Sequence, residues 1–206
     1  MVTAAFFDDP TWSFVFSDPL PRAAQYQQFW ALLADGAMRF DWVWLCEGDQ
    51  ATTVWLPPGC SELTPEQEAG FEAFARTLLG PGADRLLETV DRFAAARPSE
   101  PHFYLSLLAT DPRHRGHGYG MDLLADNLTR IDAAGQAAYL ESTNPVNLGR
   151  YRGVGFEVTG RFQLPDDGPS VTTMWREPRP PVDASAQSSA QSPAQSPAES
   201  SPQSSA

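Results

Sequence analysis

The sequence predicts an α/β domain in which helices flank a central mixed β-sheet. First, segments with helical apolar spacing alternate with short apolar runs that are typical of strands. Second, Phe103–Thr110 is a mostly apolar run that suits a central strand buried on both faces. Third, a glycine-rich loop, a helix and a strand at Ala137–Glu141 follow it, in the order of a right-handed crossover between parallel strands.

The N-terminal part is predicted to contain a helix and then a β-hairpin. A short aromatic run, Trp12–Phe16, precedes a helical stretch with apolar residues at core spacing. Those apolar residues are Tyr26, Phe29, Trp30 and Leu33. Met38–Cys46 and Thr52–Leu56 are then predicted as two strands, because the polar residues 47–50 between them suit a turn.

Two helices are predicted between this hairpin and the central strand. Thr64 offers a capping hydroxyl, with proline at the first helical position and glutamine at the third. This helix should end at Gly80-Pro81-Gly82, and a second helix should begin at Asp84.

The C-terminal part is predicted to complete the sheet. The helix after the glycine-rich loop should end at Gly135, and a short helix should hold Leu148 and Tyr151. Phe156–Leu164 and Val171–Trp175 are predicted as a closing antiparallel hairpin.

Composition predicts one folded domain and a tail. Residues 1–181 should form the domain, whereas residues 182–206 are rich in Ser, Ala, Gln and Pro and should be disordered. No apolar run approaches the roughly 20 residues of a membrane helix, and no secretory signal is evident, which predicts a cytoplasmic protein. Two cysteines are too few for a disulfide scaffold.

The charge narrows the choice of ligands. The formal net charge is −12, which argues against nucleic acid as a partner and fits a cationic substrate. The 14 basic residues are all arginine. Any anionic ligand must therefore be held by arginine, histidine or backbone N–H groups.

The loop Arg113–Gly120 has the pattern of an anion site. Glycines at alternate positions let the backbone approach a ligand closely, and the following helix offers free N–H groups. A diphosphate is the anion that such a loop is best suited to bind. The loop lacks the Gly-Lys-Ser/Thr of a nucleotide triphosphatase and the glycine spacing of a Rossmann fingerprint. A glycine-rich turn without any ligand remains the alternative.

Two segments together resemble the GNAT superfamily of N-acetyltransferases. Asp111–Leu124 resembles its coenzyme A loop, with Arg115, Gly118 and Gly120 in the matching positions. A register that starts at Arg113 also fits, but it places the following leucines less well. Glu141–Phe156 resembles the second characteristic segment, which carries an asparagine, a tyrosine and a Gly-Phe pair.

Residues 52–58 and 97–176 also resemble the puromycin N-acetyltransferase-like subgroup. The chain departs from the superfamily pattern in two places: the usual first strand is missing, and His117 stands where a lysine is often found.

The resemblance implies acetyl-CoA as co-substrate and assigns residues to its site. The pantetheine arm would lie between the strands that end at Thr110 and Glu141. The implied coenzyme contacts are Leu108, Ala109, Thr110, Arg115, Gly116, His117, Gly118, Tyr119, Gly120 and Asn147. Either Asn147 or Asn144 could instead only cap the turn.

The resemblance also implies a direct attack of the amine on the thioester. Tyr151 is the candidate general acid, and Glu141 is the first candidate general base, ahead of His102. A metal site is not expected, because no carboxylate or cysteine completes a set with the three histidines.

Three functions are open at this point. The preferred one is acetylation of a small-molecule amine, such as an antibiotic or a metabolite. The acceptor could instead be a protein N-terminus or lysine. The third reading is a coenzyme-binding or interaction module without turnover. The protein is expected to be a monomer or a homodimer.

Overall fold

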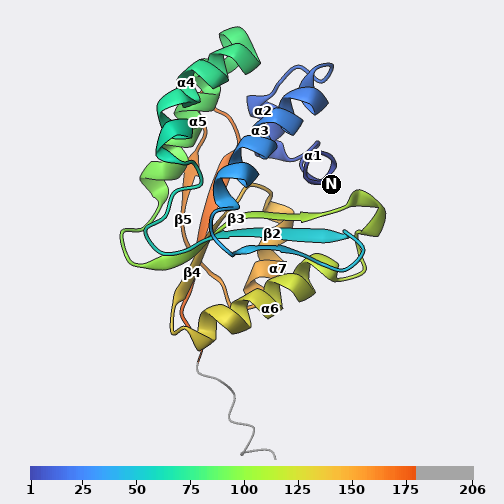
Figure 1. Ribbon diagram of the computed structural model, residues 1–206, viewed down its shortest axis with the longest axis vertical. Coiled ribbons are helices and arrows are strands. Elements are labelled where there is room, and N and C mark those ends of the chain that lie inside the picture. The colour runs from blue at the N-terminus through green and yellow to red at the C-terminus, as the bar shows by residue number, and fades with distance from the viewer. Residues whose placement is uncertain (180–206) are drawn as a thin grey trace, which may run out of the picture.

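A six-stranded mixed sheet lies between two layers of helices in the computed structural model, which describes residues 1–179 (Figure 1). The strands have the spatial order β1-β2-β3-β4-β6-β5. They are β1 (Val43–Leu45), β2 (Ala51–Leu56), β3 (His102–Thr110), β4 (Ala137–Ser142), β5 (Glu157–Gln163) and β6 (Ser170–Arg176). The predicted mixed sheet with flanking helices is therefore confirmed. The predicted tail, residues 182–206, lies outside the described residues.

Seven α-helices lie in the described part of the chain. They are α1 (Val2–Ala5), α2 (Pro10–Val15), α3 (Arg22–Ala37), α4 (Pro65–Leu79), α5 (Ala83–Ala96), α6 (Tyr119–Ala133) and α7 (Leu148–Gly153). In Figure 1, α1 to α5 lie on one side of the central strands and α6 on the other. Within residues 1–179 no strand precedes β1, which agrees with the expectation that the usual first strand is missing.

The two sides of the sheet have separate cores. On the side of α1 to α5, aromatic side chains dominate, and Tyr26, Phe29 and Trp30 of α3 are almost fully buried. On the side of α6, Leu124, Leu128 and Ile131 pack against the opposite faces of β3 and β4. Because each face of the sheet is covered, β3 is buried on both faces, as predicted.

β3 and β4 are the pair of neighbouring parallel strands, and they stay together only at their start. His102–Tyr104 pairs with Ala137–Tyr139, and no pairing is found further along in the described residues. On its other side, β3 carries a bulge, because Val54 pairs with Leu107 and Trp55 with Leu105. Ser106 is therefore the extra residue, and a bulge of this kind bends a strand away from its neighbour. The two strands diverge towards their C-terminal ends.

The predicted first strand, Met38–Cys46, is wrong at its start. α3 continues to Ala37, Met38 caps it, and only Val43–Leu45 form β1. Arg39 explains the irregular stretch, because its guanidinium bonds backbone carbonyls of a distant loop rather than facing a neighbouring strand. The other predicted boundaries hold within two residues, and Thr64 and Gln67 form the predicted capping box of α4.

Candidate active site

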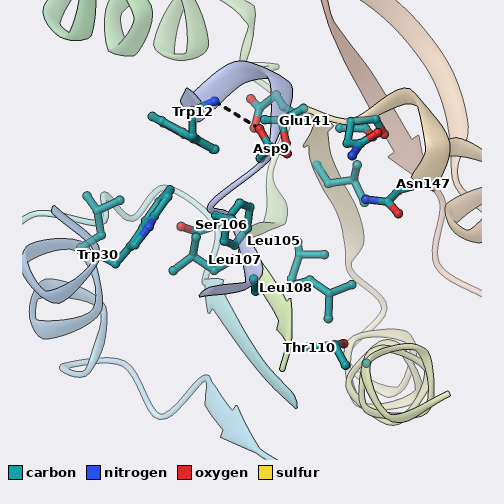
Figure 2. Close-up of a pocket in the computed structure, with 18 of the residues that line it drawn as sticks. Asp9, Trp12, Trp30, Leu105, Ser106, Leu107, Leu108, Thr110, Glu141 and Asn147 are labelled. Atoms are coloured by element: carbon teal, nitrogen blue, oxygen red, sulfur yellow. Dashed lines mark hydrogen bonds between the residues drawn. The ribbon is translucent and has the colours of Figure 1, made fainter. Parts of the chain in front are cut away.

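A cavity of about 830 Å³ opens where β3 and β4 diverge. It extends from the glycine-rich loop at the start of α6, along β3, to the helices α1 to α5. Figure 2 shows the side chains of Leu105, Ser106, Leu107, Leu108 and Thr110 following β3 through the site. The cavity therefore has two ends. The loop end lies at residues 114–120, and the acceptor end is bounded by Glu62, Arg97, Glu141 and the helices α1 to α5.

The loop end offers a cradle of backbone N–H groups. Gly116 and Gly118 have φ of 86° and 89°, a region that favours glycine. The N–H groups of residues 116–120 donate to no carbonyl in the described residues, and α6 begins at Tyr119. Gly120 lies so close to Thr110 that a Cβ there would collide with its hydroxyl. Free N–H groups at the start of a long helix suit a diphosphate.

The two arginines of the loop have different surroundings. Arg115 lines the cavity, and its Nη2 donates to the carbonyl of Ala5 at 2.8 Å. Arg113 points elsewhere, and its Nη2 lies 2.8 Å from Oδ2 of Asp111. Hydrogen bonds from Arg113 hold the pKa of the Asp111 carboxyl well below its usual range. This placement favours the register that starts at Arg115.

Most, but not all, of the predicted coenzyme contacts lie at the cavity. The predicted contacts that line it are Leu108, Thr110, Arg115, Gly116, Gly118, Tyr119, Gly120 and Asn147. Ala109 is buried and does not line the cavity. His117 is exposed, and its ring lies beside Tyr119. Asn144 also lines the cavity, and its side chain accepts from the N–H of Val146, which caps the turn.

Glu141 lies on β4 where the strands part. Both of its carboxylate oxygens are shielded from solvent, and neither has a hydrogen-bond partner of good geometry in the described residues. Burial raises the pKa of Glu141 to about 7, although Arg97 and the hydroxyls of Tyr104 and Tyr139 act in the opposite direction. A carboxylate that titrates near neutral pH and borders a cavity is well suited to accept a proton.

Tyr151 reaches the cavity from α7. Its ring packs edge-on against Phe156, with ring centroids 6.2 Å apart. Burial raises the pKa of Tyr151 to about 12, so that the phenol keeps its proton at neutral pH. The second candidate base, His102, does not line the cavity, and its Nδ1 lies 2.6 Å from the carbonyl of Glu100.

The N-terminal segment, residues 5–12, forms part of the wall of the cavity. Asp9 caps α2 by accepting from Thr11 and Trp12, and its other oxygen accepts from the hydroxyl of Thr143 at 2.7 Å. Thr143 belongs to the segment after β4, so residues far apart in the chain meet here. Sequence reasoning missed Asp9, although Asp9-Pro10 is a helix-start signal.

Two further cavity residues, Glu62 and Arg97, were also missed as site residues. Both lie in loops that connect predicted elements, where no periodicity marks them.

Two further properties of residues 1–179 bear on the site. No group of three or more His, Cys, Asp or Glu side chains could hold a metal ion among them. None of the helices in residues 1–179 has the length and apolar character required to cross a membrane.

Solved structures share this fold. The chain resembles a Corynebacterium glutamicum protein named as histone acetyltransferase HPA2 and related acetyltransferase, with a TM-score of 0.58 and 25% identity over 87% of this chain and 88% of that one. It also resembles a polyamine N-acetyltransferase of Drosophila melanogaster, with a TM-score of 0.56 and 19% identity over 85% and 90% of the two chains. The chain therefore has the fold of the GNAT acetyltransferases.

Similarity at the level of sequence covers only a small part of the chain. No family model matches the chain. A probable toxin TacT of Sinorhizobium fredii is 50% identical over 44 residues, which are 20% of this chain and 24% of that protein. The chain thus spans about a quarter of the length of that curated relative, and the puromycin-like subgroup remains a prediction.

Proposed function

We propose that this protein is an acetyl-CoA-dependent N-acetyltransferase that acetylates a primary amine of a small molecule. The observation that carries this proposal is one cavity that joins the N–H cradle of residues 116–120 to the shielded carboxylate of Glu141 and the phenol of Tyr151. The cover formed by α1 to α5 over the acceptor end favours a small acceptor over a folded protein.

The chain's residues divide the work of the reaction. Residues 116–120 and Arg115 hold the diphosphate, and the free edge of β3 beyond the bulge holds the pantetheine arm as an added strand would. Acetyl-CoA supplies the acetyl thioester. Glu141 accepts a proton from the acceptor ammonium, which frees the nitrogen to form the new C–N bond. Tyr151 donates a proton to the sulfur as the C–S bond breaks, and the second proton that the nitrogen loses as the amide forms restores the Tyr151 phenol.

Thermal melting with acetyl-CoA, CoA and ATP tests the donor site directly. Ligand at about 100 times its dissociation constant should add roughly 2.7 kcal/mol to the free energy of unfolding. We expect both CoA forms to raise the melting temperature and ATP to leave it unchanged. No shift with either CoA form would contradict the proposed donor site.

Tyr151→Phe should lower kcat by about 100-fold or more, because it removes the proton donor and keeps the packing of the ring. Affinity for acetyl-CoA, measured by calorimetry, should stay within about twofold. The matched control is Tyr26→Phe, since Tyr26 is also buried but does not line the cavity, and its hydroxyl has no partner in the described residues. Equal turnover in Tyr151→Phe and the wild type would remove Tyr151 from the mechanism.

A further inference from the structure

Basic and acidic side chains are distributed unequally between the two ends of the cavity. The loop end is lined by His114 and Arg115, and Arg150 of α7 also lines the cavity. The acceptor end is lined by the carboxyl groups of Glu62, Glu68 and Glu141, and Asp8 and Asp9 of the N-terminal segment also line the cavity. Both carboxylate oxygens of Asp9 already accept hydrogen bonds. Arg97 is the one basic residue among the described residues that line this end. An enclosed acidic region concentrates cationic ligands.

Glu62 is held in a fixed position at this end. Its carboxylate accepts from the hydroxyl of Ser106, the extra residue of the bulge, at 2.7 Å. Its backbone is fixed as well, because Arg39 donates to the carbonyls of Glu62 and Leu63, each at 2.9 Å. The second carboxylate oxygen of Glu62 accepts no hydrogen bond in the described residues. A carboxylate fixed by its neighbours, with one oxygen left over, is prepared for a ligand.

Arg97 does not neutralise these acidic groups completely. It lies over the ring of Tyr104, with its guanidinium carbon 3.8 Å from the ring centroid. In the part of the chain that the structure describes, Arg97 forms no ion pair, and its Nε has no hydrogen-bond partner. The single guanidinium of Arg97 faces two carboxylates, those of Glu62 and Glu141. Asp8 and Glu68 are exposed at the rim of the cavity. Glu62 and Glu141 together outweigh this guanidinium by one negative charge, and the rim carboxylates of Asp8 and Glu68 add two more.

Aromatic rings form the walls between these charges. The rings that line the acceptor end include those of Trp12, Phe29, Trp30, Phe71 and Phe93. Trp12 and Trp30 meet edge to face, with centroids 5.0 Å apart (Figure 2). Such walls suit an apolar linker, and their faces attract cations.

We propose that the acceptor is a primary amine that carries a second cationic group on an apolar linker and has no carboxylate, with Glu62 binding the second cation. This inference rests on the proposed acetyltransferase function, because Glu141 is taken to face the reacting amine. It adds a substrate class and a specificity-determining residue to that function.

Three matched amines test the proposal on the full chain. Diaminopentane and aminopentane differ by one ammonium group, and lysine is diaminopentane with a carboxylate added. We expect kcat/KM for diaminopentane to exceed the values for both other amines by at least about tenfold, the factor that one hydrogen bond to a charged group supplies. A series from diaminopropane to diaminooctane then finds the preferred length of the linker.

The variant Glu62→Gln assigns the effect to a residue. It should lower kcat/KM for diaminopentane by about tenfold and leave aminopentane within about twofold. Glu66→Gln is the matched control, because it removes the same charge from an exposed side chain of α4 that does not line the cavity. Equal losses for both amines in Glu62→Gln would overturn the role of Glu62 in binding the second cation.

The other outcomes separate this inference from the function on which it rests. If aminopentane reacts as well as diaminopentane, or if lysine reacts better, the substrate class is wrong while the acetyltransferase function stands. In the second case Arg97 would be the group that recognises a carboxylate. If acetyl-CoA stabilises the protein and none of a broad panel of amines is acetylated, the proposed function itself fails.

Discussion

Glu141→Gln should produce a more stable and much less active protein above neutral pH. With both substrates saturating, kcat should fall by about 100-fold or more, because the variant lacks the proton acceptor. In the wild type, kcat should rise as pH increases through about 7, where the carboxyl of Glu141 loses its proton, and then level off. The variant should lack this rise.

The effect on stability has a definite sign. The pKa of Glu141 is raised in the folded protein from 4.5 to about 7, so the folded state binds this proton more tightly than the unfolded state. Glu141 therefore contributes a loss of stability on the order of 3 kcal/mol as pH rises from about 4.5 through about 7, and the variant lacks this contribution.

Chemical denaturation of both proteins at pH 5 and pH 8 measures this difference. Glu66→Gln, which removes an exposed carboxylate outside the cavity, should match the wild type in activity and in pH dependence. If Glu141→Gln is active and loses stability at pH 8, Glu141 is a structural residue and the base lies elsewhere.

Gly118→Asp should abolish binding of acetyl-CoA. The introduced carboxylate lies at the start of α6, where it takes the N–H groups meant for the diphosphate and repels the diphosphate itself. A Cβ at this position lies 3.2 Å from Oδ2 of Asp122, which adds a second negative charge nearby. Because φ is 89° here, we also expect a loss of about 1–2 kcal/mol of folding free energy in the protein without ligand.

Gly135→Asp is the control for that backbone strain. Gly135 also has a positive φ, of 64°, but it lies beyond the other end of α6 and outside the cavity. The control should lose similar stability and bind acetyl-CoA normally in calorimetry. Normal binding by Gly118→Asp would place the diphosphate elsewhere.

The sequence predicts the fold well where local signals agree. The crossover from β3 to β4 was predictable because an apolar run, a glycine-rich loop and a helical pattern follow one another directly. The loop end was predictable for the same reason, since its glycines, Arg115 and the start of α6 are neighbours in the chain. Tyr151 and Glu141 came only from the resemblance, because no local pattern distinguishes them from core residues.

The acceptor end could not be predicted, because it depends on contacts between distant segments. The bulge at Ser106 leaves no signal inside an apolar run, although it sets the divergence of the strands. Glu62 lies in a loop without periodicity, and its orientation depends on Arg39 and Ser106. Met38–Cys46 was wrongly predicted as one long strand because a local reading of apolar residues cannot register that Arg39 bonds a distant loop.

The N-terminal segment crosses the opening between the diverging strands β3 and β4 and is bonded to both sides of it. Ala5 accepts from Arg115 in the loop after β3, and Asp9 accepts from Thr143 in the segment after β4. Anything attached to Met1 is therefore tied, through a few residues, to both walls of the cavity. An affinity tag there would lie close to the opening of the cavity, whereas a small fluorophore there would serve as a reporter of occupancy.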